Sequence, residues 1–241
     1  MTGSRWQTAG ALFPPAGKLH WRFSQDMGSS PRHAMSPLRI LILFSHPALH
    51  KSQVNRHLIA AAEEVAGVTV RHLYEIYPDY LIDVRAEQEL LVAHDLIILH
   101  HPFYWYGAPS LVKEWMDLVL EHGWAYGEGG TALRGKYMMQ AVTCGGSVEI
   151  YSSTGRNLNT VREFLLPFEQ SARLCGMTYL APFVVHGTGH LNSAADVEPH
   201  ARDYAELLAA LRDGRIDLAK AATLPWINEN PATLITQPSP S

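Results

Sequence analysis

The sequence predicts an α/β domain built on a parallel sheet of five strands with helices on both faces. Short continuous apolar runs, such as RILILF at residues 39–44 and DLIILH at 95–100, are typical of parallel strands buried on both faces. Between them lie longer stretches with apolar residues at helical spacing, and strands that alternate with helices form parallel sheets with right-handed crossovers. A chain of 241 residues, 47% of them hydrophobic, is large enough to bury such a core.

The expected strands and helices alternate along the chain. The expected strands are residues 39–44, 68–73, 95–100, 137–143 and 179–186. The expected helices are residues 54–65, 86–92, 110–120, 161–174 and 194–211. The third helix has the clearest pattern, with apolar side chains at Leu111, Val112, Trp115, Leu118 and Val119. Because ligands of such sheets bind outside the carboxyl ends of the strands, we expect the loops after the first, third and fourth strands to carry the function.

The two ends of the chain differ from this domain, which we place at residues 37–213. Residues 1–36 lack periodicity and are rich in turn-forming residues, so we expect a flexible N-terminal extension. Residues 214–241 finish in TQPSPS, and we expect them to form a loosely ordered C-terminal tail.

Composition excludes several classes of function. The net charge of −4 and a pI near 6.3 argue against a protein that binds nucleic acid or anionic membranes. No apolar run approaches the roughly 18 residues of a membrane span, and no apolar segment of a secretory signal is present. Two cysteines in a chain of this length do not form a disulfide framework, so we expect a reducing, cytoplasmic environment.

The loop after the first strand has the features of a phosphate site. A helix should begin between Ser52 and Asn55, and its free N–H groups and dipole favour an anion. The Ser52 hydroxyl and His46 can add hydrogen bonds or charge. Alternatively, Ser52 is only a helix N-cap and His46 a polar strand end. The loop lacks the Gly-x-Gly-x-x-Gly pattern of a dinucleotide turn, which weakens the case for a primary NAD site.

The loop after the third strand, residues 101–109, reads HPFYWYGAP. Its aromatic side chains can stack on a planar cofactor ring, and its proline and glycine allow the backbone to approach a ligand. The alternative is that these aromatic residues pack under the next helix or form a subunit interface. The loop therefore predicts a ring-binding site or a contact surface.

After the fourth strand, Thr143 and Cys144 lead into Gly145 and Gly146. Paired glycines allow backbone N–H groups to approach the polar edge of a ligand, although many such pairs are simply turns. Cys144 beside this turn is either a reactive thiol or a small buried residue, and the second is more common.

Thirteen histidines raise the question of a metal site. His186 and His190 have ligand-like spacing and His100 adjoins His101, but no set of Cys, His and Asp completes a site. We therefore predict that the protein binds no metal.

Five motifs together resemble the flavodoxin-like NAD(P)H:quinone oxidoreductases, and most closely the ancillary oxidoreductase subunits of bacterial glutathione-regulated potassium efflux systems. The resemblance extends over residues 39–211. The motifs are SHPxxxxSxxN at 45–55, HPFYWY with its following proline at 101–109, GWAYGEGGTALRGK at 123–136, TCGG at 143–146 and PFEQSARLCGM at 167–177.

This resemblance implies a flavodoxin-like fold with strand order 2-1-3-4-5 and a bound flavin, FMN or FAD, with NAD(P)H as co-substrate. The first loop would hold the phosphate and ribityl chain, the second would flank the isoalloxazine, and the third would hydrogen-bond its pyrimidine edge. The cofactor-binding residues it implies are His46, Ser52, Val54, Asn55, Pro102, Phe103, Tyr104, Trp105, Thr143, Cys144, Gly145 and Gly146.

The implied reaction is ping-pong hydride transfer from NAD(P)H through the flavin to a quinone or a related electrophile. In the broader family a Tyr and a His beyond the glycine turn stabilise the charge that develops. Tyr151 stands at the matching Tyr position, or is alternatively an ordinary loop aromatic, and Asn157 stands where the His is expected. This departure puts a two-residue proton relay in doubt.

The resemblance also implies partners. Family members are usually homodimers with the flavin near the subunit boundary, and the loop at 123–130 with Trp124 and Tyr126 either contributes to that region or is a solvent loop with tucked aromatics. The chain is either a free-standing quinone reductase or a regulatory subunit that activates a potassium efflux transporter. In the second case it would lie peripherally at the inner membrane. A bare electron carrier is less favoured, since such carriers tend to be strongly acidic.

Overall fold

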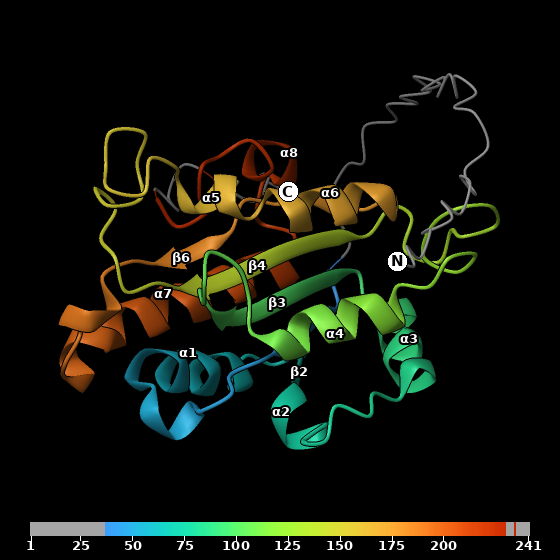
Figure 1. Cartoon of the computed structure of the whole chain (residues 1–241), viewed down its shortest axis with the longest axis horizontal. Coiled ribbons are helices and arrows are strands. Elements are labelled where there is room, and N and C mark those ends of the chain that lie inside the picture. The colour runs from blue at the N-terminus through green and yellow to red at the C-terminus, as the bar shows by residue number, and fades with distance from the viewer. Residues whose placement is uncertain (1–36, 230–233, 235–241) are drawn as a thin grey trace, which may run out of the picture. The chain divides into compact units, whose positions relative to one another are not determined.

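The computed structural model describes residues 37–229 and residue 234; the predicted N-terminal extension, residues 1–36, lies outside the described residues. The centre of the described part of the chain is a parallel sheet in the order β2-β1-β3-β4-β5, with a further strand, β6, that also pairs with β4 (Figure 1). The strands are β1 Ile40–Phe44, β2 Val68–His72, β3 Leu96–Pro102, β4 Tyr137–Thr143, β5 Thr178–Tyr179 and β6 Phe183–Val185. The predicted fold class and strand order are confirmed.

Helices cover both faces of this sheet, because alternate side chains of each buried strand point to opposite sides. On one face, Ile40 and Ile42 pack with α1 (Gln53–Glu63) and α7 (Ala194–Arg212). On the other, Leu41 and Leu43 pack with the second group of helices. This group consists of α3 (Val84–Ala93), α4 (Ser110–Val119), α5 (Val161–Phe164) and α6 (Leu166–Leu174). The short elements are η1 (Leu49–Lys51), α2 (Leu73–Ile76), η2 (Thr188–His190) and α8 (Leu218–Ala221).

Two predicted elements are each divided in two. The helix expected at 161–174 is interrupted at Leu165, because Pro167 in the first turn of α6 has no N–H to continue the hydrogen bonds of α5. The strand expected at 179–186 becomes β5 and β6, separated by a segment that contains Pro182, which likewise cannot donate to a ladder. Within the described residues, the sheet therefore has six strands rather than five.

Part of the C-terminal tail is packed against the sheet. Asp217 caps α8 by accepting a hydrogen bond from the Lys220 amide, and Leu218 and Ala221 are buried in the core. The boundaries of the domain and its two ends otherwise stay a prediction.

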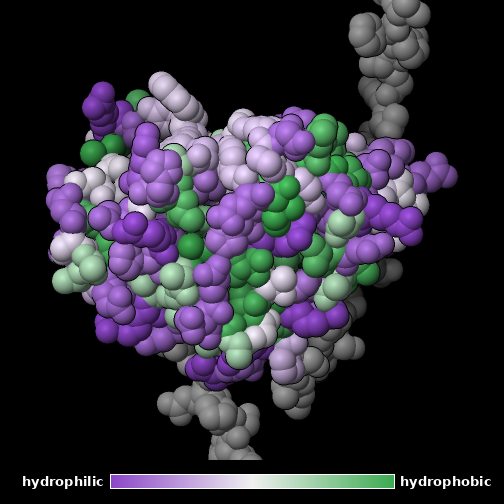
Figure 2. Space-filling model, turned by 90° about the horizontal axis from the view of Figure 1, so that it is seen from below, coloured by the Kyte–Doolittle hydropathy of each residue, from purple (hydrophilic) through white to green (hydrophobic). Residues whose placement is uncertain are grey.

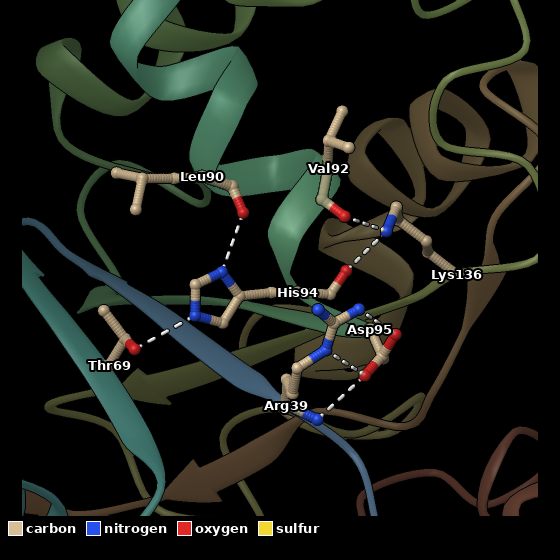
Figure 3. Close-up of polar contacts among 7 residues, drawn as sticks. All are labelled: Arg39, Thr69, Leu90, Val92, His94, Asp95 and Lys136. Carbon is tan, nitrogen blue, oxygen red and sulfur yellow. Dashed lines mark hydrogen bonds and ion pairs between the residues drawn. The ribbon is translucent and has the colours of Figure 1, made fainter.

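A polar cluster fastens the amino ends of the strands (Figure 3). The Arg39 guanidinium donates to both carboxylate oxygens of Asp95, at 3.0 and 3.1 Å. Lys136 Nζ donates to two backbone carbonyls at the end of α3, one of them that of His94 at 2.6 Å. The His94 ring in turn bonds the Thr69 hydroxyl at 3.0 Å. These groups satisfy one another, so the cluster explains how α3 is held against the sheet.

Candidate functional site at the carboxyl edge of the sheet

The three loops singled out by the sequence meet around one cavity. This cavity, of about 360 Å³, lies at the carboxyl ends of β1, β3 and β4. Its lining residues are His46, Ala48, Lys51, Ser52, Asn55, Pro102, Phe103, Tyr104, Thr143, Gly145 and Thr188. The loops after β1, β3 and β4 therefore share one cavity, which follows from the common edge at which parallel strands end.

A second cavity, of about 380 Å³, adjoins the first at the start of α1. The two share five lining residues, Lys51, Ser52, Asn55, Thr143 and Thr188. The second cavity extends to Gln53, Val54, Gly189, Leu191 and Asn192. The first cavity is thus bordered by the aromatic loop, and the second by the N-terminus of α1.

That helix N-terminus presents two backbone donors. Ser52 is the N-cap of α1, and its hydroxyl accepts from the Asn55 amide at 3.1 Å. Among the described residues, the amides of Gln53 and Val54 have no hydrogen-bond acceptor. Ser52 is therefore both an N-cap and part of the cavity wall, whereas the Val54 side chain is buried and only its backbone can serve a ligand. Free N–H groups at the positive end of a helix favour an anion.

Asn55 joins the first loop to the third. Its side-chain nitrogen donates to Thr143 Oγ1 at 2.8 Å and to Ser52 Oγ at 3.1 Å. Its Oδ1 is buried and has no partner within the described residues, although Asn55 lines both cavities. A buried acceptor without a partner is costly, so this atom fits a ligand that carries a hydroxyl donor.

His46 is a neutral donor rather than a positive charge. Its Nδ1 accepts from the Ala48 amide at 3.1 Å, which leaves the proton on Nε2. Burial lowers the pKa of His46, so the ring is uncharged at pH 7. Its ring lies edge-on to that of Tyr104, with 6.2 Å between centroids.

The aromatic loop divides between the cavity and the surface. Phe103 is buried and, with Pro102 and Tyr104, lines the first cavity. Trp105 does not line either cavity and is 95% exposed. Trp105 and Tyr106 have φ angles of 49° and 63°, in the left-handed region that such residues rarely adopt. Of the four loop residues expected to flank a ring, Pro102, Phe103 and Tyr104 therefore line the first cavity and Trp105 does not.

The glycine turn leaves space at one residue and none at the next. A Cβ on Gly145 would meet nothing within 4 Å, whereas one on Gly146 would come 2.8 Å from Cε2 of Tyr151. The side chain of Cys144 is buried, which raises the pKa of its thiol to about 12 and makes a thiolate nucleophile unfavourable at pH 7. Cys144 lines neither cavity, and its amide already donates to the Val185 carbonyl.

Tyr151 stands behind this turn. Its ring contacts Phe103 edge-on, with 5.6 Å between centroids, but it does not itself line either cavity. Burial raises the pKa of Tyr151, against the opposing effect of a side-chain hydrogen bond with Asn157, so the phenol is protonated at pH 7. The two residues that the sequence paired are therefore neighbours, and the pair presents a hydroxyl donor.

Sequence reasoning missed one side of the site. Thr188 and Lys51 line both cavities, and Gly189, Leu191 and Asn192 line the second. The loop after the last strand was weighed only for metal ligands, at His186 and His190, although its two glycines, Gly187 and Gly189, were a signal for close backbone approach. The aromatic residues of the 123–130 loop, Trp124 and Tyr126, are partly buried against the core and line neither cavity.

Two buried histidines lie beneath the site at the end of β3. His101 bonds the Pro102 carbonyl at 3.0 Å and the Gln140 side chain at 2.9 Å, while Nε2 of His100 has no partner among the described residues. Burial lowers the pKa of His100 to about 3 and that of His101 to about 4. Both rings are therefore neutral in the folded protein at pH 7.

We expect acid to destabilise the fold through these histidines. Below the unfolded pKa of about 6.5, the two imidazoles bind protons in the unfolded chain but stay unprotonated in the folded protein. Stability is full above that pH and falls toward pH 4, by about 1.4 kcal/mol per pH unit for each histidine. In urea unfolding at a series of pH values, His100→Phe should lower this slope by about 1.4 kcal/mol per pH unit. The surface variant His50→Gln is the control, and an unchanged slope in His100→Phe would show that His100 is not linked to folding.

Neither a metal cluster nor a membrane span is found within residues 37–229. No group of three His, Cys, Asp or Glu side chains there is placed to hold a metal ion. No helix of this part of the chain has the length and apolar character to cross a membrane.

The chain is similar to known proteins in family, in sequence and in structure. A family model described as flavodoxin-like fold matches residues 38–208. The glutathione-regulated potassium-efflux system ancillary protein KefG of Pectobacterium carotovorum is 41% identical over 174 residues, which are 72% of this chain and 94% of that protein. General stress protein 14 of Bacillus subtilis is 42% identical over 174 residues, 71% of this chain and 97% of that protein.

Two solved structures extend the comparison. General stress protein 14 of Treponema denticola, solved in complex with FMN, is 40% identical with a TM-score of 0.67, and the match covers 72% of this chain and 99% of that protein's chain. An NADPH-quinone reductase from P. pentosaceus is 32% identical with a TM-score of 0.63, and the match covers 70% of this chain and 97% of that protein's chain.

Proposed function

The chain belongs to the flavodoxin-like family, and we propose that it is an FMN-dependent NAD(P)H:quinone oxidoreductase. The observation that carries the proposal is the pair of adjoining cavities, one at a helix N-terminus and one beside aromatic side chains. A ligand with a phosphate tail and a flat ring would place the phosphate at the helix N-terminus and the ring beside the aromatic side chains. The relative from Treponema denticola that was solved with FMN supports FMN over FAD.

The residues present fit this cofactor. The free amides of Gln53 and Val54, with Lys51 nearby, would hold the phosphate. The unpartnered Oδ1 of Asn55 would accept a ribityl hydroxyl. Pro102, Phe103 and Tyr104 would border the ring on one side, and the open space at Gly145 would admit its polar edge; both sets of residues line the first cavity. Bound FMN would supply hydride chemistry, with NAD(P)H and a quinone or related electrophile reacting in turn.

The chain itself would contribute fixed donors for the charge that develops at the polar edge of the ring. The amide of Gly145 has no acceptor among the described residues, and Tyr151 carries a protonated hydroxyl behind the same turn. Donors that are already oriented stabilise developing charge without reorganisation. Asn157 would hold the Tyr151 hydroxyl, and because an amide does not titrate, it would orient this group rather than relay a proton.

Anaerobic mixing tests the proposed reaction. FMN-loaded protein should lose its yellow absorbance when NADH or NADPH is added, and a quinone should restore it. Steady-state kinetics with both substrates varied should give the parallel double-reciprocal lines of a ping-pong mechanism. Protein that binds FMN but is not bleached by either nucleotide would refute the oxidoreductase proposal.

A second function is favoured by the similarity to KefG. We propose as the alternative that the chain binds and activates a potassium efflux transporter and lies in the cytoplasm, peripherally at the inner membrane. Efflux from cells that express such a transporter should rise when the chain is co-expressed. A variant that cannot bind FMN and still activates efflux would favour this regulatory role over catalysis.

We also propose that the protein forms a homodimer through exposed apolar residues near the site. Hydrophobic residues gather in the middle of the face seen from below Figure 1, the side on which α2 lies (Figure 2). Tyr80 and Leu81, in the segment after α2, are exposed, and the Tyr80 hydroxyl bonds Ser110 at the start of α4, directly after the loop that holds Trp105. Aromatic residues of this kind are enriched at interfaces.

Trp105→Asp should therefore shift the protein from dimer to monomer. Truncating an interface anchor costs about 2 kcal/mol or more, or roughly 30-fold in dimer affinity, and Asp tolerates the left-handed backbone at this position. Light scattering across a dilution series measures the effect. Leu174→Asp, a change at an exposed apolar residue of α6, is the matched control. Equal dissociation in both variants, or in neither, would contradict the proposed interface.

A further inference from the structure

Residues 214–229, which we call the C-terminal strap, lie beyond the family match at residues 38–208 and cover the outer edge of β6. β6 pairs with β4 along one side, so its other side would expose unpaired backbone groups. Asn228 satisfies both groups of Val184: its Oδ1 accepts from the amide and its Nδ2 donates to the carbonyl, each at 2.9 Å. The adjacent amide of Ile227 donates to the Pro182 carbonyl at 2.9 Å.

The strap is also fastened to α5. The guanidinium of Arg162 donates to the carbonyl of Ala222 at 2.9 Å and also to that of Leu224. These bonds precede Trp226 in the chain, and the two hydrogen bonds of Asn228 to Val184, which we call the Asn228 clamp, follow it. The backbone around Trp226 is therefore held at both ends.

Trp226 begins a row of rings that reaches the candidate site. Its ring lies 5.6 Å from that of His186, and the His186 ring lies 6.2 Å from that of Tyr151. Tyr151 in turn contacts Phe103 at 5.6 Å, and Phe103 lines the first cavity. All three distances in this row of four rings, Trp226–His186–Tyr151–Phe103, are within the range of direct aromatic contact.

Tyr151 lies in a segment without regular structure, where the side chain of Asn157 bonds its hydroxyl but no helix or strand fixes its backbone. Residues 147–159 form turns and bends without a helix or strand. Among the described residues, the Tyr151 amide has one acceptor, the Ser147 carbonyl, at the long distance of 3.3 Å. A hydroxyl that stabilises charge must be held in place by packing around its ring.

We propose that the strap positions Tyr151 through Trp226 and His186, so that Trp226 and His186 are positioning residues of the reductase site. This proposal rests on the function proposed above only where it concerns catalysis. The placement of the Tyr151 ring is a property of the flavin-free chain and can be tested without FMN.

The first test follows the ring of Tyr151 by NMR in flavin-free, full-length protein with labelled tyrosines. The signal is assigned by its loss in Tyr151→Phe. Trp226→Ala and His186→Ala should shift it, and Trp226→Phe, which keeps a ring, should shift it less. Asn228→Ala should also shift it, because it releases the clamp at β6 without touching the rings.

The control for general destabilisation is Ile59→Ala, a core truncation in α1 away from the row of rings. It should leave the Tyr151 signal in place. A Tyr151 signal that does not move in Trp226→Ala and His186→Ala, or that moves as far in Ile59→Ala, would overturn the proposal. Either outcome is independent of whether the protein binds flavin, so failure here and failure of the proposed function are distinguishable.

The second test is a double-mutant cycle in the FMN-loaded enzyme. Trp226→Ala should lower the rate of flavin reduction at least about fivefold when Tyr151 is present, and less than about twofold in the Tyr151→Phe background. The dissociation constant for FMN should stay within about twofold in both backgrounds. Equal losses in the two backgrounds would show that the strap acts on the enzyme by a route other than Tyr151.

Discussion

The Ser52→Asp variant is expected to bind FMN about 100-fold more weakly than the wild type while α1 stays intact. Asp is as good an N-cap as Ser and interacts favourably with the helix dipole, so the fold should be at least as stable. Its carboxylate, however, would stand where the phosphate is proposed to bind. Two unit charges 4 Å apart repel by about 4 kcal/mol at an effective dielectric constant of 20, and solvent at this half-buried position lowers the net cost to about 3 kcal/mol.

Riboflavin provides the control for this variant, since it carries the same ring without the phosphate. Quenching of flavin fluorescence gives both dissociation constants. Riboflavin should bind the wild type and Ser52→Asp alike, and Ser52→Thr, which keeps the cap without a charge, should bind FMN almost normally. If affinity for FMN and for riboflavin fell equally, the substitution would be damaging the cavity as a whole. That result would contradict a phosphate site at α1.

Tyr151→Phe is expected to slow flavin reduction by roughly 30- to 1000-fold, since one oriented donor is worth about 2–4 kcal/mol of barrier. The ring that packs on Gly146 and against Phe103 is retained, so FMN should still bind. Stopped-flow mixing with NADPH under anaerobic conditions measures the rate directly. Tyr106→Phe removes another hydroxyl from the aromatic cluster and should have little effect.

Asn157→His provides a second comparison for the role of Tyr151. A histidine beside the phenol would introduce a group that titrates near pH 6.5, so the rate should acquire a pH dependence that the wild type lacks. A reduction rate in Tyr151→Phe equal to that of the wild type would exclude the hydroxyl from the chemistry, and the pair would then be structural.

The fold was predictable because its determinants are local. Runs such as RILILF signal strands buried on both faces wherever they occur, and alternation with helices dictates a parallel sheet. The errors were local as well. Pro167 and Pro182 each lack the N–H that would continue the element, so the helix and the strand predicted around them are divided.

The site was predictable only as far as strand order allowed. The loops after β1, β3 and β4 converge because carboxyl ends of parallel strands share one edge. Thr188 was missed because its place beside Thr143 depends on the pairing of β6 with β4, which periodicity does not reveal. The outward direction of Trp105 follows from a positive φ that the sequence does not signal, and the role of Trp226 depends on a contact with His186 forty residues earlier.

We propose that three loops and one helix N-terminus form a single FMN site. Amide NMR spectra of the flavin-free protein, recorded as FMN is added, test it most directly. The amides of Gln53, Val54, Gly145 and Gly146 should shift together and saturate at one FMN per chain at micromolar concentration. Flavin that is not retained at that concentration, or that shifts amides at only one of these two places, would contradict it.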